Sequence, residues 1–515
     1  MNLAPNTGIG KTAKRTESLM KLISTRGGFG AGSMPSEAIA QGLCGDGGLF
    51  APLALPKFSS QDIDKMGRMN YADCAALLLA PFLPEFTETE LTAFTTAAYQ
   101  SFPCDAAPVV NLSDGKDIHL LELFHGPTCA FKDFALQLLP HLLSSSTKKV
   151  YPGKTAVILA ATSGDTGKAA LEGFMDVDAT KIMVFYPADG ISNIQRLQMT
   201  TQPGNNLAVI GIEGNFDHAQ SGVKGIFADA ALSARLADNG YLFSSANSIN
   251  WGRILPQIVY YFYAYTRLIK SGAIKPGGLI NVSVPTGNFG NILAAYYAKK
   301  CGLPIHRLIC ASNRNNVLTD FINTGVYDRN RTFYATTSPS MDIVISSNIE
   351  RLLFDVYNDS NQIKELMTEL STNGRYSITL EALKVIQSHF YAGFADDEEV
   401  AAIIGDCFAN QSYLADPHTA VGIKVLRDYR QKTGDNTPAI VAATASPYKF
   451  AHSVLAALGI ESSKDDDFGD MEALMKKSGI KIPSALFGLK GKHEIFTDVI
   501  KPADMKNSLI EWLKI

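Results

Sequence analysis

The sequence predicts an α/β protein in which helices cover both faces of a parallel β-sheet. Two observations support this fold class. Short, unbroken apolar runs such as TAVILAA (155–161) and LINVSVP (279–285) predict buried strands, and a polar, glycine-bearing turn and a helical pattern follow each of them. Strands of this kind that alternate with helices are typical of a parallel sheet that is covered on both faces.

Four regions are expected along the chain. Residues 1–105 carry glycine clusters and an acidic helix, and are expected to form a helical, loop-rich N-terminal domain. Residues 150–250 are expected to form a smaller α/β domain that carries the turn SGDTG. Helical patterns dominate residues 346–435, which we expect to be a helical insertion. A large α/β domain is expected from the remaining segments, 106–149, 251–345 and 436–515.

Composition favours a globular protein that acts on small molecules. The 515 residues are 46% hydrophobic and 19% charged, and the formal net charge is −4 with no basic run, which gives no electrostatic case for nucleic acid. No apolar run reaches the ~18 to 20 residues of a membrane helix, and the N-terminus has no signal-peptide pattern. The seven cysteines form no C-x-x-C pair and the nine histidines no ligand pair. We therefore expect a cytoplasmic protein without a metal, nucleic-acid or membrane partner.

Three polar turns each follow directly on an apolar strand. They are SGDTG (163–167), GNFGN (287–291) and TASPYK (444–449). In an open α/β sheet the carboxyl ends of the parallel strands lie at one edge, and ligands bind in the crevice there. The three distant turns are therefore expected to converge on one site.

The GNFGN turn has the features of a phosphate cradle. Its glycines allow close backbone approach, and free N–H groups at the start of the following helix face an anion. As a local pattern, an ordinary strand-to-helix turn is an equally good interpretation. No G-x-G-x-x-G or Walker motif occurs, which disfavours a nucleotide cofactor. The predicted cofactor-binding residues of this turn are Gly287, Asn288, Phe289, Gly290 and Asn291.

The SGDTG turn suits a substrate carboxylate, because hydroxyl and backbone donors are concentrated in it. Asp165 is the exception, since a carboxylate repels a bound anion, and we expect it to cap the following helix. The predicted substrate-binding residues here are Thr162, Ser163, Gly164, Asp165 and Thr166.

Lys132 lies between Phe131 and Asp133 in a run that reads as partly buried helix. Burial disfavours the ammonium form, by up to ~3–5 pKa units, and a neutral amine is the nucleophile that forms Schiff bases. A lone lysine in such a run is more often a snorkelling surface residue. Thr444 offers a neutral hydroxyl that suits a ring nitrogen, although a helix cap is an equally good interpretation. With both anion turns, Lys132 and Thr444 resemble a pyridoxal phosphate site.

Seven motifs follow one another between about Ser24 and Phe450: HGPTCAFKDFALQLL, SGDTGKAA, SNIQRLQM, NSINWGRILPQIVYYF, PTGNFGN, SPSMDIVISSNIERLLF and DPHTAVG. As a set they resemble threonine synthase, in the form shared by fungi and many bacteria. The resemblance implies a fold-type II pyridoxal phosphate enzyme similar to tryptophan synthase β, with two open parallel-sheet domains. The implied reaction converts O-phospho-L-homoserine and water to L-threonine and phosphate, in a monomer or homodimer.

The resemblance also implies roles for single residues. Lys132 resembles the Schiff-base lysine, which also serves as acid and base, and Thr444 resembles the partner of the pyridine nitrogen. The leaving phosphate needs cations and donors, for which the candidates are Arg253, Asn250, Ser192, Gln195 and Arg196. An ordinary surface helix is an equally good interpretation of residues 192–196. His125 and His418 belong to the shared motifs but are assigned no catalytic step.

Two departures from the family pattern leave alternatives open. Asn291 stands where many relatives have Asp, and Ser446 stands where many have His. One alternative is a pyridoxal phosphate lyase or dehydratase, which makes 2-oxobutyrate from phosphohomoserine or deaminates serine and threonine. Another is a non-catalytic pyridoxal phosphate-binding protein. The motifs SNIQRLQM and NSINWGR favour a phosphorylated substrate.

Overall fold

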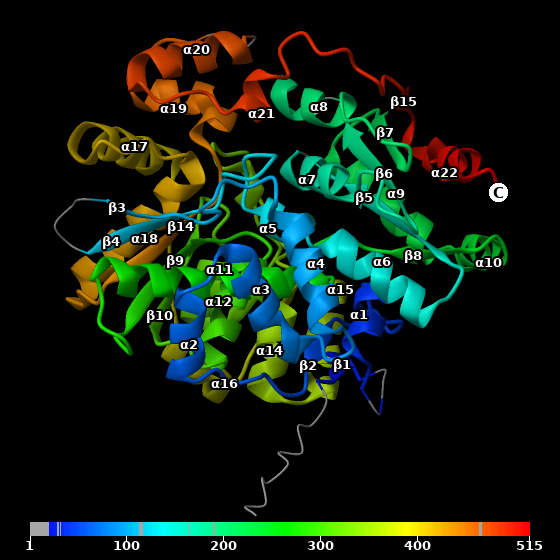
Figure 1. Ribbon diagram of the computed structural model, residues 1–515, viewed down its shortest axis with the longest axis horizontal. Coiled ribbons are helices and arrows are strands. Elements are labelled where there is room, and N and C mark those ends of the chain that lie inside the picture. The colour runs from blue at the N-terminus through cyan, green and yellow to red at the C-terminus, as the bar shows by residue number, and fades with distance from the viewer. Residues whose placement is uncertain are drawn as a thin grey trace, which may run out of the picture.

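The chain builds two open sheets whose strands run almost entirely parallel (Figure 1). The computed structural model describes residues 20–27, 30, 32–112, 117–162, 164–188, 191–462 and 466–515. Helices pack against the strands of both sheets. The predicted α/β class with parallel sheets is confirmed.

The larger sheet has six strands in the order β13-β10-β9-β14-β4-β3. Strands β9 and β14 are buried along their whole length, because helices such as α12 and α18 pack against the sheet. This explains the unbroken apolar runs in the sequence. Strand β3 alone runs antiparallel, at one edge. The strands are β3 (Val109–Asn111), β4 (Ile118–Glu122), β9 (Ile280–Pro285), β10 (Ile305–Ser312), β13 (Phe390–Phe394) and β14 (Ala439–Ala443).

The smaller sheet has five parallel strands in the order β15-β7-β6-β5-β8. A separate hydrophobic core forms where α9, α10 and α22 bury apolar side chains against it. The strands are β5 (Thr155–Ala161), β6 (Thr180–Pro187), β7 (Leu207–Ile212), β8 (Tyr241–Ser244) and β15 (Val499–Ile500). The three helices are α9 (Phe216–Ala228), α10 (Ala230–Asp238) and α22 (Met505–Leu513).

Two features differ from the predicted domain boundaries. The segment 346–435 is not wholly helical, because β13 pairs in parallel with β10 as an edge strand of the larger sheet. Its sequence, FYAGF, holds a glycine and is only partly buried, so it lacks the apolar run of a central strand. In addition, β15 joins the smaller sheet, although residues 436–515 were expected in the large domain. A strand of two residues carries no recognisable sequence pattern.

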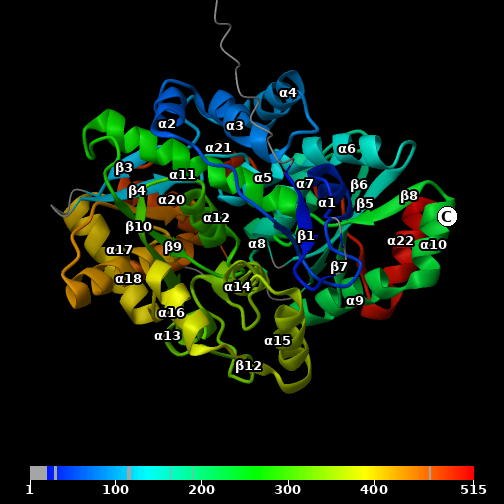
Figure 2. The same cartoon turned by 90° about the horizontal axis from the view of Figure 1, so that it is seen from below.

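The N-terminal region is helical, as expected, and packs mainly against other helices (Figure 2). Helix α11 (Trp251–Ser271) is buried along most of its length and contacts α2, α3, α5 and α12. It thereby joins the N-terminal helices to the centre of the molecule. The N-terminal elements are β1 (Leu22–Ser24), α1 (Pro35–Gln41), β2 (Phe50–Pro52), α2 (Ser60–Gly67), α3 (Tyr71–Leu79) and α4 (Glu88–Tyr99).

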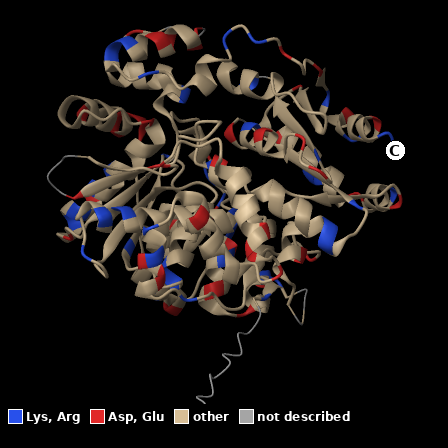
Figure 3. Ribbon diagram, in the orientation of Figure 1, with Lys and Arg blue, Asp and Glu red and all other residues tan. Residues whose placement is uncertain are grey.

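Positive and negative side chains are interspersed over the outer helices (Figure 3). None of the described helices combines the length and the apolar character that crossing a membrane requires. The remaining helices are α5 (Lys132–Leu136), α6 (Leu139–Val150), α7 (Asp165–Phe174), α8 (Asn193–Thr200), α12 (Gly290–Lys300), α13 (Val317–Thr324), α14 (Ile349–Tyr357), α15 (Ser360–Asn373), α16 (Leu380–His389), α17 (Asp397–Gln411), α18 (Pro417–Thr433), α19 (Ala451–Ala457), α20 (Asp467–Ser478) and α21 (Ser484–Phe487). The short pair β11 (Val326–Asp328) and β12 (Arg375–Ser377) and the 3-10 turns η2 (Pro339–Met341) and η3 (Pro447–Phe450) complete the elements used below.

Candidate active site

The backbone before Lys132 pairs with the turn that follows β14. The N–H of Phe131 donates to the carbonyl of Thr444 at 2.8 Å, and the N–H of Ser446 donates to the carbonyl of Cys129 at 3.0 Å. Ala130 and Ala445 form an antiparallel bridge between these two contacts. The TASPYK turn therefore lies directly beside Lys132, although more than 300 residues separate the two segments.

A rigid turn holds Lys132 at the start of α5. Asp133 accepts hydrogen bonds from the backbone N–H and the hydroxyl of Thr128, at 2.9 and 2.5 Å. Gly126 is required here, because a Cβ atom would lie 2.5 Å from Asp133 Oδ2. Cys129 adopts a left-handed conformation with φ of 59°, which is strained for a non-glycine residue. The motif HGPTCAFKD thus fixes where the lysine side chain begins.

The amine of Lys132 lies in a largely buried, polar setting. Its side chain is 13% exposed, which confirms the predicted burial. Nζ donates to Ser340 Oγ at 3.3 Å and lies 3.7 Å from Asp165 Oδ2. Burial lowers the pKa of Lys132, the charges of Lys449 and Arg253 lower it further, and Asp165 opposes them. At a given pH, a larger fraction of Lys132 is therefore neutral than of an ordinary lysine.

Asp165 does not cap α7, and that prediction is wrong. Gly164 occupies the cap position, and the Asp165 carboxylate forms a buried ion pair with Lys449. Burial opposes the ionisation of Asp165, but Lys449 and Lys132 hold its pKa well below the usual range. A lysine as deeply buried as Lys449 needs a counter-ion, and that need explains why the carboxylate turns toward it.

The SGDTG turn is built by the hydroxyl of Thr162. This oxygen accepts from the N–H groups of Gly164 and Gly167, both at 3.1 Å, so it is committed to the turn. Thr166 is half-buried in the first turn of α7. Ser163 lies outside the described residues. Gly164 has φ of 154°, and a Cβ there would collide with the side chain of Gln195, which places Gln195 against the turn.

The GNFGN turn approaches its neighbours closely through its backbone. A Cβ at Gly287 would lie 2.8 Å from the carbonyl oxygen of Ser340, so only glycine fits. The carbonyl of Gly287 accepts from Ser346 Oγ at 2.8 Å, and the carbonyl of Asn288 accepts from Asn348 Nδ2 at 2.9 Å. Phe289 is left-handed, with φ of 61°, and α12 begins at the next residue. The first N–H groups of α12 have no intrahelical acceptor and are available to an anion.

Asn291 adds a donor to this helix start. Its Oδ1 accepts from the hydroxyls of Tyr260, at 2.8 Å, and Tyr261, so the amide orientation is fixed. Its Nδ2 is buried and has no hydrogen-bond partner among the described residues. A buried donor without a partner is unfavourable, which points to a ligand that accepts from it.

Thr444 keeps its hydroxyl free in the described part of the structure, while its carbonyl is held by Phe131. The alternative that Thr444 caps a helix is wrong, because Ser446 is the cap of η3. The hydroxyl of Ser446 accepts from the N–H of Tyr448 at 3.4 Å.

Two of the candidate phosphate ligands differ in how far their polar groups are already used. Asn250 caps α11 and donates both Nδ2 hydrogens, to the carbonyls of Ile39 and Ser245. Arg253 is buried one turn later, and its Nε has no partner among the described residues. Burial lowers the pKa of Arg253 to about 10. Arg253 therefore retains an unsatisfied donor, whereas Asn250 positions the helix.

Helix α8 and its cap, which carry the other phosphate candidates, contact the C-terminal segment of the chain. Ser192 caps α8, accepting from the N–H of Gln195 at 3.2 Å. Arg196 forms an ion pair with Glu494, and the N–H of Ile194 donates to Asp467 Oδ2 at 3.1 Å. In Figure 1 the orange and red C-terminal segment passes beside α8. Arg196 is thus already paired with a carboxylate, which sequence reasoning did not foresee.

Three site residues were not predicted from the sequence: Ser340, His418 and Lys449. Ser340 contacts Lys132 and Asp165, and its N–H donates to His418 Nε2 at 3.3 Å. Their only signal was their position in the motifs SPSMD, DPHTAVG and SPYK.

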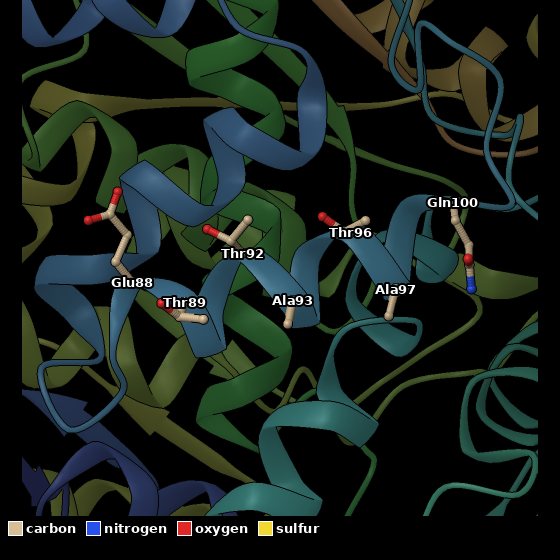
Figure 4. A pocket seen from close by; sticks show the side chains of 7 residues that line it. All are labelled: Glu88, Thr89, Thr92, Ala93, Thr96, Ala97 and Gln100. Carbon is tan, nitrogen blue, oxygen red and sulfur yellow. The ribbon is translucent and has the colours of Figure 1, made fainter.

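A shallow hollow follows one face of α4 (Figure 4). It contains none of the residues described above. Its lining comes from a single helix and the residue after it: Glu88, Thr89, Thr92, Ala93, Thr96, Ala97 and Gln100.

Two open parallel sheets, with a buried lysine and glycine-bearing turns at the strand ends, define the fold-type II class of α/β enzymes. Comparisons with known proteins identify the family within this class. A family model described as "Threonine synthase N terminus" matches residues 21–99, and one described as "Threonine synthase, C-terminal" matches residues 419–506.

Whole-chain relatives agree. The chain is 39% identical to threonine synthase from Pseudomonas aeruginosa, over 84% of this chain and 90% of that protein. It is 42% identical to threonine synthase-like 1 from Pongo abelii over 83% of this chain, but it spans only 58% of the length of that relative. A crystal structure of pyridoxal phosphate-bound threonine synthase from Brucella melitensis has a TM-score of 0.85 and 38% identity, covering 96% and 99% of the two chains. The yeast threonine synthase structure has a TM-score of 0.86 and 33% identity, covering 97% and 99%. The chain belongs to the threonine synthase family.

Proposed function

We propose that the protein is a threonine synthase that uses pyridoxal 5′-phosphate. The reaction converts O-phospho-L-homoserine and water to L-threonine and phosphate, the last step of threonine biosynthesis. The observation that carries the proposal is the position of the Lys132 amine, which is buried beside the turns after β5 and β14 and contacts Ser340, whose carbonyl lies against the turn after β9. Membership of the threonine synthase family supplies the chemistry.

The residues present fit the cofactor. The free N–H groups at the start of α12 and the unpartnered Nδ2 of Asn291 suit its phosphate. The hydroxyl of Thr444 suits the ring nitrogen, and the amine of Lys132 suits the carbonyl carbon. Asn291 brings no negative charge to the phosphate site. When bound, pyridoxal phosphate supplies an electron sink for carbanions at the substrate carbons.

The residues of the chain then have distinct tasks. Lys132 accepts and returns protons, which its lowered pKa favours. The start of α7, with Gly164 and Thr166, holds the substrate carboxylate through hydroxyl and backbone donors. Arg253 stabilises the leaving phosphate with its charge and its unpartnered Nε.

The α8 candidates have a narrower task in this proposal. Gln195 lies against Gly164 and forms part of the wall of the substrate site. Ser192 and Arg196 shape α8 rather than contact the phosphate, because the cap and the ion pair with Glu494 engage them. Asp165 likewise lies beside the substrate without binding it, because its carboxylate is paired with Lys449.

A cytoplasmic location, a small-molecule substrate and a monomer or homodimer complete the proposal. All seven cysteines, which lie in the described part of the chain, are free thiols, and six are buried. Free thiols in this number fit a reducing compartment.

The second candidate function is a lyase that releases phosphate and yields 2-oxobutyrate. The observation that favours it is Ser446, which stands where the resemblance to the family leads one to expect His and whose hydroxyl caps η3. A side chain without an imidazole leaves one less group to guide the added water.

A product assay separates the two functions. The purified protein, loaded with pyridoxal phosphate, is given O-phospho-L-homoserine while phosphate, threonine and 2-oxobutyrate are measured together. Equal amounts of threonine and phosphate, both lost in Lys132→Ala, are expected. Phosphate accompanied by 2-oxobutyrate alone would make the protein a lyase, and no phosphate release would contradict both functions.

A further inference from the structure

The amine of Lys132 is one corner of a triangle of polar groups. Nζ donates to Ser340 Oγ at 3.3 Å, and the Ser340 hydroxyl donates to Asp165 Oδ2 at 3.3 Å. The third side is the 3.7 Å separation of Lys132 Nζ from the same carboxylate oxygen. One hydroxyl therefore accepts from the amine and donates to its counter-ion at the same time.

The surroundings hold Ser340 in place without help from the lysine. Its N–H donates to Nε2 of His418, whose Nδ1 lies 2.8 Å from Asp416 Oδ1. This pairing assigns the ring hydrogen to Nδ1 and leaves Nε2 as the acceptor that Ser340 needs. On the other side, the carbonyl of Ser340 lies against Gly287, where a Cβ would be only 2.8 Å away.

The loop that carries Ser340 is also anchored at both ends of η2. Asp342 accepts from Asn313 Nδ2 at 2.7 Å and from Asn315 Nδ2 at 2.9 Å, and Ser338 Oγ accepts from Asn313 Nδ2 at 3.0 Å. A network satisfied in this way fixes the loop. The hydroxyl is therefore pre-positioned for the amine.

Asp165 is equally constrained, and its two oxygens are divided between two partners. Lys449 pairs with Oδ1, and Lys449 is itself held by a hydrogen bond to the carbonyl of Thr128 at 3.1 Å. Oδ2 remains for Ser340 and Lys132. The ion pair keeps the carboxylate charged, so Oδ2 is available as an acceptor.

We infer that Ser340 and Asp165 form a seat for the free amine of Lys132 and position it for proton transfer. In the ammonium form, one N–H bonds to Ser340 and Asp165 offsets the charge. In the neutral form, an N–H still bonds to Ser340, and the lone pair is directed away from that bond. Ser340 and Asp165 are positioning residues, because they act through Lys132. The purpose of the seat rests on the proposed function.

Charged groups from several elements face this amine and determine in which direction each substitution is expected to shift the pKa of Lys132. Asp165 from α7 favours the ammonium form, whereas Lys449 from η3 and Arg253 from α11 disfavour it. His418 from α18 reaches the amine through Ser340. Removing Asp165 or Ser340 should therefore release a proton from Lys132 at lower pH, since both stabilise the charged form.

The test measures the titration of Lys132 in the full-length chain without cofactor. The rate of acylation of Lys132 by acetic anhydride is followed against pH, with peptide mass spectrometry as the readout. Ser340→Ala is expected to raise the acylation rate below the midpoint by roughly 3- to 10-fold, which corresponds to up to about one pKa unit. Asp165→Asn is expected to shift the midpoint in the same direction and further.

Matched variants separate the seat from a general effect on the loop. Ser340→Thr keeps a hydroxyl and is expected to restore the wild-type midpoint. Thr337→Ala removes a hydrogen bond to Asp397 in the same loop and is expected to leave Lys132 unchanged. In the loaded enzyme, Ser340→Ala should shift the pH profile of kcat with little change in KM.

An unchanged midpoint in a folded Ser340→Ala protein would overturn the inference, and so would an equal shift in Thr337→Ala. If Asp165→Asn fails to fold, the pair Ser340→Ala and Ser340→Thr still decides the outcome. The acylation test needs no turnover. A shifted midpoint without threonine production would therefore remove the proposed function alone, and threonine production with an unchanged midpoint would remove the seat alone.

Discussion

Lys449 and Asp165 form a buried ion pair that joins the two sheets of the molecule. Lys449 lies in the turn after β14 of the larger sheet, and Asp165 lies in the turn after β5 of the smaller sheet. Both side chains are almost fully enclosed, with 1% and 4% of their surface exposed. The pair therefore fixes the relative position of the two turns that flank Lys132.

Breaking this pair is expected to destabilise the fold strongly. Lys449→Met leaves the buried Asp165 carboxylate with only Lys132, 3.7 Å away, as counter-ion, and we expect a loss of about 3 kcal/mol in the free energy of unfolding. Adding Asp165→Asn should recover part of that loss, because the buried carboxylate charge that lost Lys449 is then removed. Urea unfolding measures both variants. Lys424→Met, which removes partly exposed pairs with Asp428 and Glu399, is the control and should change stability by less than about 1 kcal/mol. Equal effects at Lys449 and Lys424 would contradict the argument.

The strand ends of the site could be predicted from the sequence, because each strand is a buried apolar run and each turn carries glycine or proline. Lys132 was proposed from a different signal, a run that reads as partly buried helix, together with the expected convergence of the three turns. Ser340 could not be found in this way, since a serine in a loop has no periodicity and its role depends on contacts with Lys132 and Asp165.

Long-range pairings explain the other differences. Asp165 was expected to cap α7, but the position of Lys449, 284 residues away, decides its orientation. Glu494 engages Arg196 across 298 residues. The edge strand β13 and the two-residue strand β15 have weak local patterns and are defined by pairing with β10 and β7.

Gly126 is expected to tolerate no side chain. A Cβ there would lie 2.7 Å from Phe102 Cζ and 2.5 Å from Asp133 Oδ2, so Gly126→Ala must displace the turn that positions Lys132. We expect a loss of roughly 1–3 kcal/mol in stability and weaker cofactor binding. Thermal unfolding and the absorbance of bound pyridoxal phosphate measure the two effects. Gly225→Ala, at an exposed position of α9 with open space around it, should instead stabilise by about 0.5–1 kcal/mol.

Arg196 and Glu494 are expected to behave as one unit. If Arg196 acts only by pairing with Glu494, then Arg196→Gln and Glu494→Gln should change KM for O-phospho-L-homoserine by similar factors. The double variant should then match either single variant, because the interaction is lost only once. Steady-state kinetics of the three variants provide the measurement. A much larger rise in KM for Arg196→Gln than for Glu494→Gln would show that Arg196 contacts the substrate itself.

Asp133 is expected to make stability fall as pH rises from about 4 to about 6. Burial raises the pKa of Asp133 to about 6 in the folded protein, whereas an unfolded Asp titrates near 3.9. The folded state therefore binds the extra proton in this window, and ionisation above it weakens the fold by about 3 kcal/mol. The pH dependence of stability that Asp165 contributes has the opposite sign. Its pKa lies below the unfolded value, so the stability it contributes is lost only as pH falls below about 4.

A comparison of wild type with a variant that lacks the Asp133 carboxyl isolates this contribution. The free energy of unfolding of wild type and Asp133→Asn is measured by urea between pH 4.5 and 7. Because Asn does not titrate, the variant should gain on wild type as pH rises, by about 2 kcal/mol between pH 4.5 and 7. Asp217→Asn, at an exposed position of α9, is the control and should follow wild type throughout. A constant difference between wild type and Asp133→Asn would mean that the Thr128 hydrogen bonds keep Asp133 ionised despite its burial.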